Sequence, residues 1–327
     1  MSICYVYYGV YSCISLGVKM KFIILRLPAC LAKYAMLATV FCITGAAVQA
    51  QTAVSVTDTS GWNAWQSPAG SRINDIQADQ QTGQTTDDFV GDATYAGFQQ
   101  KAGTIGGTNS ILFRARFDSF SAADKWGNGG NFGIGMDLDG NGTVDLITMY
   151  NEGSGNVSGR SRTVTFGTPG PGANNSPSTT TWTFPTQTAI NLTLNTTYDL
   201  VAATDFAGFN GSQDAWMTIA LSFADLQNAI RTYAVGFSTY TLDYTSRISF
   251  IGFTSQSSNA LNQDLYGAGV GGTTSAATFA ALGAMTAPID AYGVIPEPAT
   301  YAQVGIFLFM GGLLAYRKRK AAARARA

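Results

Sequence analysis

The chain of 327 residues contains no histidine, and its 4 cysteines all lie before residue 51. A product that begins at residue 51 therefore has neither an imidazole nor a thiol. This excludes Ser-His-Asp and Cys-His catalysis, and it excludes ordinary zinc sites, which depend on His and Cys ligands. It also excludes a disulfide framework, so the body of the chain must be stabilised by a hydrophobic core.

Basic residues are scarce in the middle of the chain. The first 50 residues carry four Lys or Arg and no acid, and residues 317–326 carry six and no acid. Residues 51–294 hold the remaining nine basic residues against 19 acidic ones. The net charge of this segment is about −10, which disfavours nucleic acid as a partner.

The N-terminal region has the pattern of a secretory signal. Residues 34–46 are almost wholly apolar, basic residues precede them, and Ala47-Val48-Gln49-Ala50 supplies the small residues that a signal peptidase reads. We expect cleavage after Ala50. Met20 offers a second start, which gives a leader of more ordinary length. The alternative is a retained N-terminal membrane helix, for which the apolar run is short.

The C-terminal region has three parts. The motif Pro296-Glu297-Pro298 precedes an uncharged stretch at 301–316, and a basic cluster follows it. The cluster comprises Arg317, Lys318, Arg319 and Lys320. Sixteen helical residues span about 24 Å, which flanking side chains can extend towards a bilayer core of about 30 Å. We expect a single transmembrane helix with a cytoplasmic basic tail and the body outside.

This tail, residues 295–327, resembles the PEP-CTERM sorting signal of Gram-negative bacteria, which some collections call an ice-binding protein C-terminal domain. The resemblance rests on the Pro-Glu-Pro motif, the apolar helix and the Arg/Lys-rich end. It implies recognition by an exosortase and export to the cell surface or exopolysaccharide matrix. It implies nothing about ice binding. The alternative is a plain membrane anchor that happens to follow Pro-Glu-Pro.

The body between these ends is expected to be a mainly β domain over residues 51–266. Its composition favours strands and tight turns, and several segments alternate apolar and polar residues, as half-buried antiparallel strands do. Strands at this density predict a β-sandwich or jelly roll. The expected strands cover 111–117, 132–138, 144–150, 163–166, 181–184, 190–194, 198–203, 215–221 and 247–253.

Two segments depart from this strand pattern. Residues 222–231 predict one short helix, because Ser222 can cap its first turn and Phe223, Leu226 and Ile230 fall on one helical face. Residues 267–294 are low in charge and rich in Gly, Ala and Thr, which predicts a flexible stalk. Within that range, 276–285 is alternatively one more packed element.

One loop carries the spacing of a calcium site. Oxygen-bearing side chains fall at positions 1, 3, 5 and 9 of the loop that starts at residue 137, with glycine at position 6. The predicted ligands are Asp137, Asp139, Asn141, the Thr143 carbonyl and Asp145. Hard cations such as Ca²⁺ prefer such oxygen ligands on a flexible turn. The first five positions resemble an EF-hand loop, but position 12 is Thr148 and the flanks predict strands. The whole loop more closely resembles the calcium loops between strands of extracellular repeat proteins, with Asn141 in place of the commoner Asp.

The alternative without a metal is an ordinary hairpin loop, since Asp139-Gly140 and Asn141-Gly142 are favoured turn dipeptides. Crowded carboxylates favour a cation over a simple turn. A bound ion is expected to be structural, because no distinctive base lies nearby. A second acidic group is expected to be a solvated loop without a metal. It comprises Asp75, Asp79, Asp87, Asp88 and Asp92.

These observations favour a non-enzymatic, exported structural protein of the cell surface or exopolysaccharide matrix. Its expected partners are signal peptidase, an exosortase, the membrane and exopolysaccharide. The first alternative is a carbohydrate-binding module in which Trp62 and Trp65 stack on sugar rings, although aromatic residues of a β-domain are usually core. The second is a glycoside hydrolase or lyase, which needs two acids about 5–9.5 Å apart. Glu152 is the only Glu of the body.

Overall fold

The computed structural model describes residues 3–7, 10–15, 18–19, 52–81, 87–119, 131–151, 162–205, 207–209, 211–255, 261, 263–268 and 276–293. The chain forms two compact units, 1–50 and 51–327. In the first, three antiparallel strands pair in the order β1-β2-β3. They are β1 (Ile3–Tyr7), β2 (Val10–Ser15) and β3 (Val18–Lys19).

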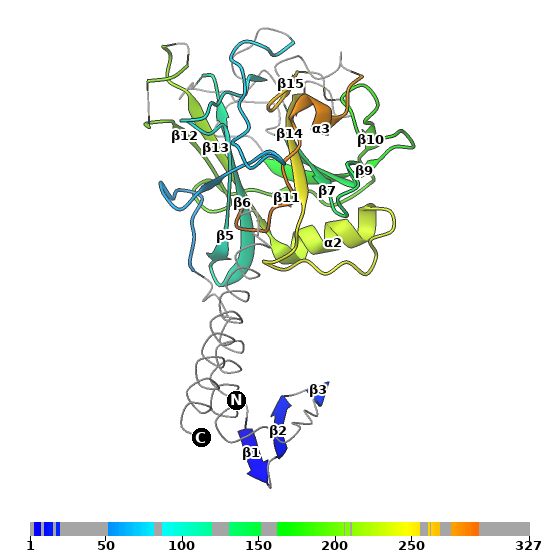
Figure 1. The fold of residues 1–327 in the computed structure, drawn as a ribbon. Helices are drawn as coiled ribbons and strands as arrows, with labels where there is room; N and C mark the ends of the chain where they lie inside the picture. Colours follow the sequence, from blue (N-terminus) through cyan, green and yellow to red (C-terminus); the bar gives the residue numbers. More distant parts are fainter. Residues whose placement is uncertain are drawn as a thin grey trace, which may run out of the picture. The chain divides into compact units, whose positions relative to one another are not determined.

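The second unit contains two antiparallel sheets that face each other, as Figure 1 shows. One sheet has the order β12-β13-β6-β5-β4. Its strands are β4 (Asn63–Ala64), β5 (Phe98–Ile105), β6 (Thr108–Phe117), β12 (Tyr198–Ala202) and β13 (Ala215–Ser222).

The other sheet has the order β10-β9-β8-β7-β14-β15, and β11 also pairs with β9. Its strands are β7 (Asn131–Asp137), β8 (Leu146–Asn151), β9 (Thr163–Pro169), β10 (Trp182–Thr183), β11 (Ile190–Asn191), β14 (Ser249–Ser255) and β15 (Asp264–Leu265). The prediction of a mainly β, sandwich-like body is confirmed.

The core between the sheets is aromatic. Phe98 and Phe113 of one sheet and Phe132 and Phe250 of the other are fully buried in one cluster. Trp65 lies among them, stacked on Phe98 with ring centroids 4.0 Å apart. Burying aromatic side chains contributes about 1.5–3 kcal/mol each, so this cluster contributes strongly to the stability of the domain.

The predicted short helix is α2 (Phe223–Tyr233). The Ser222 hydroxyl accepts a hydrogen bond from the Asp225 amide at 2.9 Å and so caps the first turn. Phe223, Leu226 and Ile230 are buried, as the helical periodicity predicts. The helix contacts β6 and β13 of one sheet and β9 of the other, so it closes one end of the sandwich (Figure 1).

The outer face of β6 differs from the expectation of a charged, solvated surface. Leu112 packs against Val54 and Val56 of the preceding segment, and Arg116 is fully buried. Arg116 forms ion pairs with Asp205 and, at 3.1 Å, with Asp214. The alternating pattern predicted the strand, but a segment far away in the sequence covers its polar face.

Within the predicted stalk, the structure supports the alternative of a packed element at 276–285, and packing on the sandwich continues to residue 293. A single helical turn, α3 (Phe279–Leu282), buries Phe279. Beyond it, Ile289 forms a β-bridge with Ile248, and the Thr286 hydroxyl accepts the Phe250 amide at 2.9 Å. The sequence left both interpretations open, because Gly/Ala/Thr composition is also that of a linker.

The predicted signal cleavage at Ala50, the sorting motif and the transmembrane stretch 301–316 lie outside the described residues. Among the residues that the structure does describe, no helix is long and apolar enough to cross a bilayer.

Candidate metal centres

The predicted calcium loop joins β7 to β8, which are neighbouring antiparallel strands. Asp137 is the last residue of β7, and β8 begins at Leu146, two residues later than the predicted strand start. Asp137, Asp139 and Asp145 each offer one carboxylate oxygen within 4.8 Å of the others. The loop therefore assembles three of the predicted ligands at one point, where they could hold a metal ion.

Backbone amides shape this loop around Asp137. Its Oδ1 accepts the amides of Gly140 at 2.8 Å and Asn141 at 3.2 Å, and its Oδ2 accepts the amide of Gly142 at 2.9 Å. Gly140 and Gly142 have φ of 77° and 83°, a region that glycine adopts without strain. The two glycines thus let the chain turn tightly around a nearly buried carboxylate.

The other predicted ligands are also tied within the loop. Asp145 accepts the Leu138 amide at 2.8 Å, and Asn141 accepts the Thr143 amide at 2.7 Å. The exposed Asp139 accepts the Asn141 amide at 3.1 Å. These bonds support a turn without a metal as well, so the geometry agrees with both interpretations of the sequence.

Electrostatics favours a positive partner in this loop. The pKa of Asp145 is raised to about 6, mainly by burial and also by the nearby Asp139 and Asp137 carboxylates, against the lowering effect of the Leu138 amide. Burial likewise raises the pKa of Asp137. A cation placed among the three carboxylates would stabilise their ionised forms.

The second acidic group is not the solvated loop that the sequence suggested. Asp75, Asp87 and Asp88 are at most 4% exposed. Oxygens of Asp75 and Asp79 meet an oxygen of Asp264, all within 4.8 Å of one another. We call Asp75, Asp79 and Asp264 the buried acidic cluster, and it too could hold a metal ion.

Sequence reasoning missed Asp264 because it lies far from the other two acids and has no recognisable spacing. Its place on β15, opposite Thr254 of β14, brings it to the cluster. Asp92, the fifth acid of the predicted group, instead accepts the amides of Thr94 at 2.7 Å and Tyr95 at 2.6 Å. The burial of Asp75 marks it as a candidate metal ligand, and this burial is visible only in the folded structure.

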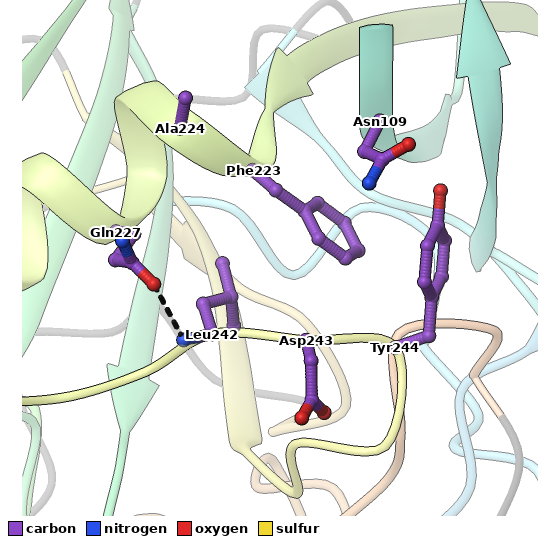
Figure 2. Close-up of a pocket in the computed structure, with 7 residues that line it drawn as sticks. All are labelled: Asn109, Phe223, Ala224, Gln227, Leu242, Asp243 and Tyr244. Carbon is purple, nitrogen blue, oxygen red and sulfur yellow. Dashed lines mark hydrogen bonds between the residues drawn. The ribbon is translucent and has the colours of Figure 1, made fainter. Parts of the chain in front are cut away.

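The surface of the described residues also has hollows, which are separate from the acidic clusters. One, of about 380 Å³, lies between the start of α2 and the segment 242–244 (Figure 2). Its walls include the rings of Phe223 and Tyr244, 4.6 Å apart, and Gln227 accepts the Leu242 amide at 3.0 Å. Asp243 is the single acid of its lining, and its side chain points away from Phe223 (Figure 2).

The other hollow, of about 220 Å³, lies over the β6–β13 sheet. The half-buried Trp62 lines it, with the Arg114 guanidinium 5.2 Å from its ring and 4.3 Å from the Trp216 ring. Asp205 and Gln99 add polar groups. Trp65, the other predicted sugar-stacking residue, is wholly buried in the core and cannot contact a ligand.

Comparison with known protein families, curated proteins and solved structures finds no match to this chain.

Proposed function

We propose that this chain is an exported, non-catalytic structural protein of the surface or exopolysaccharide matrix of a Gram-negative bacterium. The observation that carries the proposal is the tail, in which Pro296-Glu297-Pro298, an apolar stretch and a basic end follow one another. The cleavage-like sequence before Ala50 supports export at the other end. An exosortase sorts the protein through this tail while a single membrane helix anchors the intermediate.

In the same proposal, the loop 137–145 binds Ca²⁺ and joins β7 firmly to β8. Support comes from the ligand spacing and from three carboxylates that approach within 4.8 Å. Oxygen-only ligands suit a hard cation. Extracellular modules bind Ca²⁺ with Kd values of about 10⁻⁴–10⁻³ M, so even a site with Asn141 in place of a carboxylate fills outside the cell.

The sorting role is tested in a producing cell that contains an exosortase. Deletion of residues 296–327, or the triple change Pro296→Ala/Glu297→Ala/Pro298→Ala, is expected to abolish the surface pool measured by cell fractionation and immunoblotting. Pro288→Ala is a matched control, because Pro288 is an exposed proline that lies just before the motif. A surface pool unchanged by the deletion would refute the proposal.

A second candidate function is carbohydrate binding, which the hollow at Trp62 favours. A half-exposed indole beside Arg114, Asp205 and Gln99 combines a stacking surface with hydrogen-bonding groups. Exopolysaccharide is the ligand class that fits the proposed location. This function is compatible with a structural role, because a matrix protein must hold its polysaccharide.

A further inference from the structure

The buried acidic cluster joins two distant parts of the chain. Asp75 and Asp79 belong to the loop before β5, and Asp264 belongs to β15. Asp75 is 4% exposed and Asp264 is 0% exposed. Both oxygens of the half-buried Asp79 are also shielded from solvent. Three carboxyl groups therefore meet in a place that water does not reach.

Hydrogen bonds do not satisfy these carboxyl groups. Both oxygens of Asp75, both oxygens of Asp79 and Oδ1 of Asp264 have no hydrogen-bond partner, while Oδ2 of Asp264 accepts the Phe89 amide at 2.6 Å. No described Lys or Arg forms an ion pair with any of the three. Buried carboxylates without partners are strongly unfavourable, so this arrangement lacks a positive charge.

Further buried oxygens without hydrogen-bond partners lie close to the cluster in the sequence, and they also favour a positive charge there. Asp88, whose Oδ2 accepts the Ala78 amide at 2.8 Å, keeps a second buried oxygen without a partner. Gln80, next to Asp79, is 7% exposed and its side-chain oxygen has no hydrogen-bond partner either. Acceptor oxygens thus outnumber donors around the cluster.

We propose that Asp75, Asp79 and Asp264 bind a second Ca²⁺ ion, distinct from the ion of the loop 137–145. Ca²⁺ takes oxygen ligands at about 2.3–2.6 Å, so ligands on opposite sides of it lie about 5 Å apart. The cluster oxygens lie within 4.8 Å of one another and fit this spacing. Zinc is excluded by the donor set, because the chain has no His and the body has no Cys.

The ion holds the loop at 75–79 against the sheet edge formed by β14 and β15. Asp264 pairs with Thr254, near the C-terminal end of β14, whereas Asp137 of the other loop pairs with Ser249, its first residue. The two ions therefore bind near opposite ends of β14. Each ion fixes one loop against this sheet.

The alternative to a cation is a proton, since protonated carboxyl groups also lose their charge. Substitution by Asn separates these possibilities. Without Ca²⁺, Asp75→Asn or Asp79→Asn removes charge repulsion and should raise the melting temperature. With Ca²⁺, the same variant lacks a ligand and should gain less from the ion than the wild type. A cluster neutralised by protons shows no Ca²⁺-dependent difference of this kind.

The experiment uses the full-length chain in detergent, stripped with EDTA and dialysed against CaCl₂. Metal content by plasma emission spectrometry should give two Ca²⁺ per wild-type chain, and one for Asp75→Asn, for Asp79→Asn and for Asp139→Asn. Asp92→Asn is the matched control and should keep two, because its carboxylate caps two amides outside the cluster. Saturating Ca²⁺ should raise the wild-type melting temperature by about 5–10 °C.

Each outcome decides the proposal. An Asp75→Asn variant that keeps the ion of the loop 137–145 is folded, so loss of one ion supports the second site. If Asp75→Asn does not melt cooperatively, Asp79→Asn gives the decision, because Asp79 is less buried than Asp75. Full Ca²⁺ content in Asp79→Asn, or binding of Mg²⁺ in place of Ca²⁺ at equal concentration, overturns the proposal. If the wild type binds one Ca²⁺, Asp139→Asn also binds one, and Asp79→Asn binds none, the loop 137–145 does not bind Ca²⁺ but the buried acidic cluster does.

Discussion

Asp75 and Asp264 lie near opposite ends of the β-domain sequence, yet the fold brings an oxygen of each within 4.8 Å of the other. Both side chains are buried, and neither Asp75 oxygen accepts a hydrogen bond. A fold does not bury two acids side by side without compensation, because each buried charge costs several kcal/mol. This pair therefore links the stability of the domain to the ionic conditions around it.

Asn141→Asp should strengthen Ca²⁺ binding at the loop 137–145 about tenfold, because Ca²⁺ affinity follows the number of charged ligands. In EDTA the same change should lower the free energy of unfolding by about 0.5–1 kcal/mol. It replaces the bond that the Asn141 side-chain amide donates to Asp139, 3.1 Å long, with charge repulsion. Calorimetric titration and urea denaturation measure the two effects. A higher free energy of unfolding for Asn141→Asp than for the wild type in EDTA would contradict this account of the loop.

The metal-free protein should lose stability as the pH rises from about 4 to about 7. Burial raises the pKa of Asp88 to about 7 and that of Asp79 to about 6, whereas an unfolded Asp titrates near 3.9. The folded state therefore binds more protons than the unfolded state in this window, and folding weakens as those protons leave. Urea denaturation in EDTA at pH 5 and pH 8 measures the slope.

Asp88→Asn should flatten this pH dependence, because it removes the group with the higher of the two pKa values. Asn can still accept the Ala78 amide that Asp88 accepts at 2.8 Å, so the local structure is kept. Greater stability of the wild type at pH 8 than at pH 5 in EDTA would contradict this account. It would mean that the buried carboxyl groups are ionised in the folded, metal-free protein.

Substitution by Ala should affect stability most at Trp65 and ligand binding most at Trp62. Trp65→Ala should cost about 3–5 kcal/mol of stability, because the indole is fully buried against Phe98 and Phe250. Trp62→Ala should cost less and should reduce retention on the producer's polysaccharide, because Trp62 lines the hollow beside Arg114. Affinity electrophoresis measures retention. Equal retention of wild type and Trp62→Ala at matched folding would exclude this hollow as the binding surface.

Ser222→Ala should destabilise the domain by about 1 kcal/mol. The Ser222 hydroxyl accepts the Asp225 amide at 2.9 Å and donates to the Asp225 carboxylate at 2.6 Å, so both bonds are lost. Ser222→Thr keeps the hydroxyl and serves as the control. Guanidinium denaturation followed by circular dichroism measures both variants, and an unchanged midpoint for Ser222→Ala would mean that the cap contributes little.

Local pattern was sufficient to predict most of the body. The alternation from Ile111 to Phe117 predicts β6, and the spacing of Phe223, Leu226 and Ile230 predicts α2, because side-chain periodicity reports which face a strand or helix buries. The approach of Asp137, Asp139 and Asp145 was also predictable, because these residues are neighbours in one tight loop of the sequence. The strands that the sequence did not predict are very short, as β4 and β15 are, or lack a clear alternation of apolar residues, as β5 does.

The amino-acid sequence alone was enough to predict a mainly β body, to exclude His and Cys chemistry in it, and to mark the loop 137–145 and the two end segments from which export is proposed. Each depends on residue types or on spacing within a few residues. Three findings required the packed fold: Trp65 is core while Trp62 lines a hollow, Arg116 is buried between acids, and Asp75 and Asp79 meet Asp264. Burial and distant contacts arise when sheets pack together, and no local pattern of residues encodes which segment will cover which.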